Sequence, residues 1–225
     1  MRPLRTAFTA LLPALLLACS APSRPPPAST PDAGAAWYGQ AARQGHHIWR
    51  IDAARSLITV TVRRGGPLAR FGHDHVVASR AVNGFVAPHA NRADLHFRLD
   101  QMTVDEPALR QAARLDTQPS PEAIAGTRAN MLGRVLEADR FPRVFLHAQR
   151  IPGQIDALRL TVTLHGVARS MTVPVKLEYT SSMITASGEL ALRQSDFGIT
   201  PMSVMGGAMT VQDRMELQFK LVAVR

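Results

Sequence analysis

The stretch LTVTLHGVARSMTVPV, residues 160–175, contains two runs in which apolar and polar residues alternate, with a glycine between them. Alternation with a period of two is typical of strands that bury one face and expose the other. Pro174 falls inside the second run, and because proline has no backbone N–H, we expect an edge or a bulge there. This part of the chain therefore predicts two half-buried strands.

The same alternation recurs along the chain, most clearly in LITVTVRR from residue 57, DLHFRLD from residue 94 and RMELQFKLVA from residue 214. About eight such strands would close into a barrel with room for one ligand. The apolar positions that would face its interior include Ile58, Val60, Val62, Leu95, Phe97, Leu99, Leu160, Val162, Leu164, Val173, Val175, Leu217 and Phe219. Two interpretations stay open, since these side chains could line a cavity or fill one another in a packed barrel.

One stretch reads as a helix, from Ser120 to the residues before Pro142. Ser120 is a suitable N-cap and Pro121 suits the first helical position, while Pro142 ends the pattern. Gly126 and Gly133 could divide the stretch into two short helices. Many strands and one helical insert predict a mainly all-β fold, in which an antiparallel sheet curls or closes.

The first residues, MRPLRTAFTALLPALLLACS, have the layout of an export signal, with a basic start and a short apolar run. LLAC at residues 16–19 resembles a bacterial lipobox, although Leu17 is larger than usual, and implies lipidation of Cys19. We therefore expect a lipoprotein-type signal peptide at 1–18, a Pro/Ala/Ser-rich tether at 19–36 and one domain at 37–225. By resemblance to lipoprotein sorting, Ser20 favours the outer membrane, facing the periplasm. The alternative is a soluble periplasmic protein.

The stretch RFGHDHVV, residues 70–77, raises the possibility of a second kind of site. In a strand, His73 and His75 would lie on one face, spaced so that both could bind one metal ion, with Asp74 on the other face. In a loop, all three could converge. The alternatives are a solvated turn and acid–base catalysis. The rival hypothesis is therefore a metal- or haem-binding exported protein that uses the pair His73 and His75, with Asp74 as a further candidate metal ligand.

The remaining composition narrows the classes of function. The formal net charge is +9, but the arginines are scattered rather than clustered with aromatic residues, which argues against a nucleic-acid surface. The single cysteine excludes an internal disulfide. SDFG at 195–198 lacks the companion motifs of a kinase, and neither a nucleophile elbow nor a metalloprotease helix motif occurs. We therefore expect no enzyme and no obligatory cofactor.

Several motifs, in order, carry a family resemblance. They are WRID at 49–52, SLITVTVRR at 56–64, EADRFPRVFLHA at 137–148, LTVTLHGVARSMTVPV at 160–175, RQSDFGI at 193–199 and VQDRMELQFKLVA at 211–223. The chain resembles the YceI family, lipocalin-like exported proteins that bind polyisoprenoid lipids. FGHDHVV departs from the family's glycine-rich turn, so the resemblance assigns no role to His73 or His75.

The resemblance implies an extended eight-stranded antiparallel lipocalin-like β-barrel with a helix over its opening. It implies an apolar tunnel for a polyprenyl chain, such as that of an isoprenoid quinone or a polyprenyl phosphate, held for carriage or storage. The expected partners are thus an isoprenoid lipid and, through the N-terminal lipid anchor, a membrane. The oligomeric state is not predicted.

Overall fold

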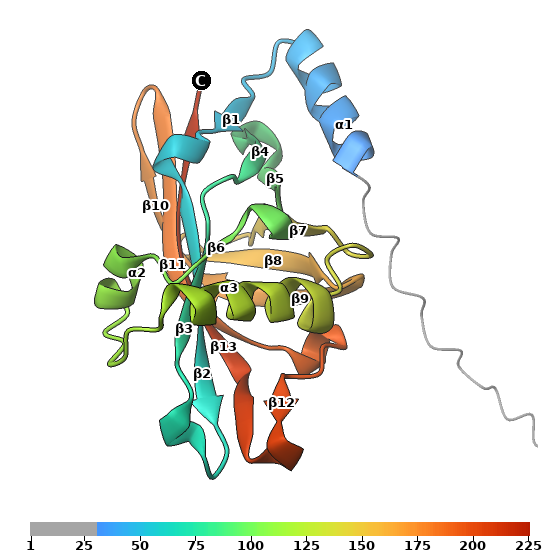
Figure 1. Ribbon diagram of the computed structural model, residues 1–225. Helices are drawn as coiled ribbons and strands as arrows, with labels where there is room; N and C mark the ends of the chain where they lie inside the picture. The colour runs from blue at the N-terminus through green and yellow to red at the C-terminus, as the bar shows by residue number, and fades with distance from the viewer. Residues whose placement is uncertain (1–30) are drawn as a thin grey trace, which may run out of the picture.

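The computed structural model describes residues 31–225 and contains one large antiparallel sheet with three α-helices (Figure 1). The helices are α1 (Pro31–Arg43), α2 (Pro107–Ala112) and α3 (Pro121–Asn130), and α3 continues into a π-helical turn, Met131–Val135. The strands are β1 (Trp49–Ile51), β2 (Leu57–Gly65), β3 (His75–Ser79), β4 (Asn83–Ala87), β5 (Arg92–Arg98), β6 (Thr103–Val104), β7 (Arg143–Arg150), β8 (Ala157–Leu164), β9 (Val167–Pro174), β10 (Lys176–Tyr179), β11 (Met183–Arg193), β12 (Ser203–Val204) and β13 (Met209–Val224).

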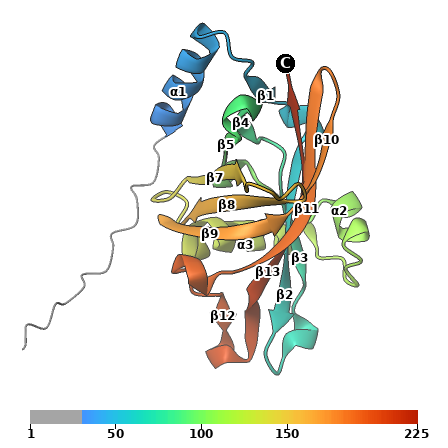
Figure 2. The same ribbon diagram turned by 180° about the vertical axis from the view of Figure 1, so that it is seen from behind.

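The longest strand, β13, is the hub of the sheet. It pairs with β11 along one edge, and with β2 and β1 in succession along the other, while β12 pairs with its first residues. From β13 the sheet continues through β1, β4, β5, β7 and β8 to β9. Viewed from behind, β7, β8 and β9 cross the long strands at a steep angle (Figure 2). The sheet thus curls around an interior.

The prediction of an eight-stranded closed barrel was wrong, because within residues 31–225 the sheet has 13 strands and is not closed. The break follows from Pro174, where an edge or bulge was expected. The ladder of β9 with β8 ends at this proline, and after Val175 the chain continues as β10, which pairs with β11 instead. Within residues 31–225, no ladder joins β9 to β11. The antiparallel, mainly β class was predicted correctly.

Gly188 in β11 shows how closely the two strands nevertheless approach. A Cβ atom at this position would lie 2.6 Å from the Pro174 carbonyl oxygen and 2.9 Å from the Phe219 ring. Neither backbone nor a packed ring can withdraw easily, so only glycine fits here. The curled sheet therefore comes together at β9 and β11 by close packing instead of ladder hydrogen bonds.

Helix α3 lies across the curled sheet, as the helical insert was expected to do (Figure 1). The Ser120 side chain accepts a hydrogen bond from the Ala123 N–H at 3.2 Å, which confirms the predicted N-cap. Two further helices were not predicted. One is α2, and the other is α1, which begins at Pro31, inside the stretch expected to be a tether.

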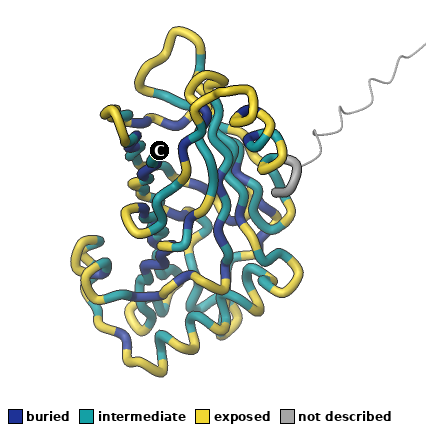
Figure 3. Tube along the Cα trace, turned by 90° about the horizontal axis from the view of Figure 1, so that it is seen from above, coloured by how far each residue is buried: buried dark blue, intermediate teal, exposed yellow. Residues whose placement is uncertain are grey.

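Buried residues form one main cluster inside the curled sheet and under α3, and exposed residues concentrate in the turns (Figure 3). A smaller cluster contains Trp49, Ile184 and Ala223, at the end of β13 that pairs with β1. None of the helices in residues 31–225 is both long and apolar enough to cross a membrane.

Candidate binding cavity

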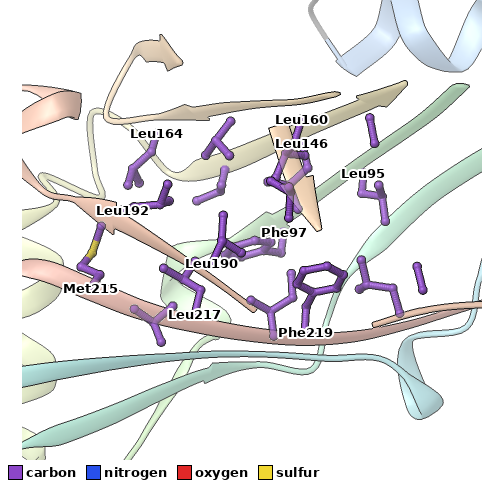
Figure 4. A pocket seen from close by; sticks show the side chains of 18 of the residues that line it. Leu95, Phe97, Leu146, Leu160, Leu164, Leu190, Leu192, Met215, Leu217 and Phe219 are labelled. Atoms are coloured by element: carbon purple, nitrogen blue, oxygen red, sulfur yellow. The ribbon is translucent and has the colours of Figure 1, made fainter. Parts of the chain in front are cut away.

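An elongated cavity of about 470 Å³ occupies the interior of the curled sheet (Figure 4). All thirteen apolar positions selected from the alternation line this cavity. Eleven of them belong to β2, β5, β8, β9 and β13, while Leu99 and Val175 directly follow β5 and β9. Side chains on successive strand residues point to opposite faces, so the alternation itself selects the interior face. The thirteen residues are therefore in place for ligand contact, and that contact stays a prediction.

Other lining residues were missed. Thr127 and Asn130 lie on one face of α3, because residues three and four apart are neighbours on a helix. Met131 and Val135 of the π-helical turn extend this face. Leu190 and Leu192 come from β11, whose alternation was weaker. A helical period was readable from residue 127 onward, but the sequence could not show what the helix face covers.

The two ends of the cavity are marked by different polar residues. The register of β13 places these ends, since Val62 pairs with Met215 near one end and Ile51 pairs with Ala223 near the other. His75 pairs with Val62, so His75 and Thr127 belong to the first end. At the second end, the lining includes Asn91, Arg92, Arg150 and Tyr179. Between them the walls are aliphatic and aromatic.

At the first end, His75 is held by a buried carboxylate. Its Nδ1 lies 2.6 Å from Asp105 Oδ2, and Asp105 Oδ1 accepts hydrogen bonds from the Val76 N–H at 3.0 Å and from Arg110 Nη1 at 2.6 Å. Burial alone would raise the pKa of Asp105, but these hydrogen bonds outweigh it and lower the pKa below its usual value. Asp105 is therefore a stable carboxylate that fixes the orientation of the His75 ring.

The structure does not favour the interpretation of His73, Asp74 and His75 as metal ligands. Asp74 Oδ1 accepts from the Arg64 backbone N–H at 2.8 Å, and Asp74 Oδ2 lies 3.3 Å from Arg63 Nη1. The His73 and His75 rings are 6.2 Å apart between centroids, and the Nδ1 atom of His73 is buried without a hydrogen-bond partner. Within residues 31–225, no three His, Cys, Asp or Glu side chains are grouped to hold a metal ion. The solvated-turn alternative also fails for His75, which lines the cavity.

At the second end, four side chains attach α1 to the sheet. The Tyr38 hydroxyl of α1 donates to Asp94 at 2.8 Å, and Asp94 also interacts with Arg92 and with His147 Nδ1, the latter at 2.6 Å. Burial, followed by the Asp94 charge, raises the pKa of Tyr38. Burial would raise the pKa of Asp94 too, but hydrogen bonds from His147, Arg92 and Tyr38 lower it to about 2. Because Arg92 also lines the cavity, α1 is coupled to its rim.

The architecture can be compared with known proteins. A sequence profile of the YceI-like domain matches residues 49–223, most of the chain. The chain belongs to the YceI-like family. No curated protein matches it.

Two solved structures share the YceI-like fold of this chain. A polyisoprenoid binding domain from Saccharophagus degradans, implicated in plant cell wall breakdown, has a TM-score of 0.57 at 11% identity, covering 79% of this chain and 99% of that chain. Burkholderia cenocepacia BcnA has a TM-score of 0.51 at 16% identity, covering 76% of this chain and 98% of that chain. At such low identities the likeness establishes the fold alone.

The predictions for the N-terminal region, the signal peptide at 1–18 and lipidation of Cys19, lie outside the described residues, as does the first part of the expected tether.

Proposed function

We propose that this YceI-like protein binds a polyisoprenoid chain in its apolar cavity and carries or stores it without chemical change. The observation that supports this most is the cavity of about 470 Å³, lined along its length by aliphatic and aromatic side chains from most strands of the sheet and from the helical turn that follows α3. The family membership and the polyisoprenoid binding domain among the related structures agree with it. The chain of an isoprenoid quinone or of a polyprenyl phosphate has the apolar, branched character that such walls accommodate.

The energetics favour carriage over extraction. Moving one methylene from water into an apolar interior gains roughly 0.8 kcal/mol, so a long prenyl chain would be held firmly against loss to water. A chain that starts in a membrane is already in an apolar medium, so its transfer into the cavity is almost neutral. We therefore expect the protein to exchange isoprenoids with membranes instead of removing them quantitatively.

Native mass spectrometry and lipid extraction of the protein purified from its natural host test this proposal. We expect a copurifying isoprenoid, or uptake of geranylgeraniol by protein that has first been stripped of lipid. Val162→Phe, which places a ring in the cavity, should reduce this uptake. Protein that carries no isoprenoid and takes up none when it is offered would refute the proposal.

We also propose that the protein is an exported lipoprotein of the outer membrane, facing the periplasm. The support is the signal-like start and the lipobox-like LLAC ahead of the tether. In a detergent phase-partition assay, the wild type should enter the detergent phase and Cys19→Ala should not. Wild-type protein recovered entirely in the soluble periplasmic fraction would contradict the proposed anchor.

A further inference from the structure

The end of the cavity near α3 presents a hydrogen-bonding group, the His75 ring, in a fixed orientation. His75 is the first residue of β3, and its side chain is 14% exposed, while that of Asp105 is fully buried. Asp105 accepts from the Val76 N–H and from Arg110, and an ionised carboxylate can only accept hydrogen bonds. The 2.6 Å contact between Asp105 and His75 therefore requires His75 Nδ1 to be the donor.

This assignment decides what the other ring nitrogen can do. In a neutral imidazole, one nitrogen donates and the other accepts, so the neutral form of His75 offers Nε2 as an acceptor. Nε2 contacts the Thr127 hydroxyl at 3.5 Å. An ordinary hydrogen bond spans roughly 2.7–3.2 Å, so this contact satisfies the acceptor poorly. Both His75 and Thr127 line the cavity, and a ligand can therefore reach this nitrogen.

The charges around His75 favour a neutral partner over an anion. Arg110 is a cation, but its guanidinium already donates to Asp105, to the Asp74 carbonyl and to Thr117. The carboxylate of Asp105 lies directly behind the ring and would repel a second negative charge. Another titratable neighbour, the ring of His73, stands edge-on at 6.2 Å between centroids. Since the charges of Asp105 and Arg110 are paired with each other, the His75 ring offers an acceptor that suits a neutral hydroxyl donor.

We propose that this end of the cavity binds the hydroxyl head of an isoprenoid alcohol or quinol, which donates its hydrogen to His75 Nε2 beside Thr127. The inference rests on the proposed polyisoprenoid function and adds a head-group preference to it. The apolar chain would extend from His75 along the aliphatic walls toward the Arg92 end. A polar group left without a hydrogen-bond partner in such a cavity is unfavourable. The site should therefore bind ligands whose hydroxyl can donate to His75 more tightly than ligands without a hydroxyl.

Two ligand pairs test the donor directly. The first is geranylgeraniol against its methyl ether, which has the same chain but no O–H group. The second is a short-chain isoprenoid quinol against the oxidised quinone, whose carbonyl oxygen cannot donate. Affinities are measured on the lipid-stripped protein in mildly alkaline buffer, above the ordinary pKa of an imidazole.

The matched variants separate the head-group site from the cavity. His75→Asn places an amide N–H near the position of Nδ1, so it can still donate to Asp105 but lacks Nε2. Thr127→Val removes the neighbouring hydroxyl at almost constant volume. Thr172→Val makes the same change at an exposed position of β9 outside the cavity lining and serves as the control.

For the wild type we expect the alcohol to bind about two- to tenfold more tightly than the ether, the effect of one net hydrogen bond, and the quinol more tightly than the quinone. His75→Asn should abolish the preference by weakening the binding of the alcohol alone. Thr127→Val should reduce the preference, and Thr172→Val should leave it unchanged. If His75→Asn does not fold, as judged from its melting curve, the wild-type ligand pairs and Thr127→Val still decide.

The contrary outcomes are distinct. Equal binding of alcohol and ether by the wild type, or a preference that survives His75→Asn, would overturn the head-group site while lipid binding stands. Tighter binding of geranylgeranyl phosphate than of the alcohol, lost in His75→Asn, would overturn the neutral-head assignment. Binding of none of these ligands would refute the proposed function itself.

Discussion

Two Val→Phe substitutions distinguish an empty cavity from a packed interior. Val162 of β8 lines the cavity and is 4% exposed, while Val76 of β3 is 2% exposed and is not part of the lining. Both are buried strand residues, so the chemical change and the local backbone are matched. The difference in free energy of unfolding between the two variants therefore reports the space in front of each side chain.

The expected magnitudes follow from the cavity. Phenylalanine exceeds valine by roughly 50 Å³, about a tenth of the 470 Å³ cavity, and filling space recovers at most ~24 cal/mol per Å³. Val162→Phe should thus range from neutral to about 1 kcal/mol more stable. Val76→Phe overpacks a filled region and should lose roughly 1–3 kcal/mol. For a chain of this size, the loss corresponds to a melting temperature lower by about 2–12 °C.

The assay is thermal unfolding of the lipid-stripped proteins, followed by circular dichroism, with urea unfolding as a check. Val162→Phe should also take up less geranylgeraniol, because its ring occupies the ligand's space. An equal loss of stability in both variants would show that the strand faces fill one another, and the cavity argument would fail.

Three further predictions concern the scaffold. The pKa of Asp94 is about 2 in the folded protein against an ordinary 3.8, so its ionisation stabilises the protein fully above about pH 4, and this contribution is lost as the pH falls through 2. Asp94→Asn should therefore flatten this part of the acid-unfolding curve and speed amide hydrogen exchange in α1. Unchanged exchange would contradict the attachment of α1 through Asp94. Ser120→Ala removes the cap of α3 and should cost about 1 kcal/mol in urea unfolding, with Ser182→Ala, in an exposed turn, as a near-neutral control. Gly188→Val would force a side chain against the Pro174 carbonyl and should lower the melting temperature. The control is Gly153→Val, which should lower it less, because a Cβ at Gly153 meets nothing within 4 Å although the φ of this residue is positive. Equal losses would mean that β9 and β11 are not in close contact.

Alternation predicted the strands well because a half-buried strand must place every second residue inside. It could not predict closure, since closure depends on where each strand changes partner. Pro174 predicted an irregularity in the strand. The sequence around it does not show, however, that the chain stops pairing with β8 there and pairs with β11 after Val175. Helix α1 was missed because PDAGAAWYGQAAR continues the small-residue composition of the preceding stretch, and its attachment comes from the contact of Tyr38 with Asp94, far along the chain.

The candidate site divides in the same way. The thirteen apolar lining residues followed from their parity in the strands, and parity is a local property. The polar end did not follow, because His75, Asp105 and Thr127 come from three separate segments. Their meeting depends on β3 pairing with β6, directly before Asp105, and on α3 lying across the sheet. The sequence suggested His75 as a metal ligand, whereas in the structure its ring contacts the Asp105 carboxylate and lines the cavity.

The role of β13 as hub has a consequence for how the chain folds. Its residues complete the pairing of β1, β2, β11 and β12, and Ile51 near the start of the domain pairs with Ala223 near the end of β13. Contacts so distant in sequence make folding slow, because the intervening chain must be ordered before they form. A growing polypeptide that lacks residues 209–224 has no strand to join β11 to β2 and β1, so its sheet cannot be completed. The nascent chain should consequently leave its sheet incomplete until residues 209–224 have been synthesised.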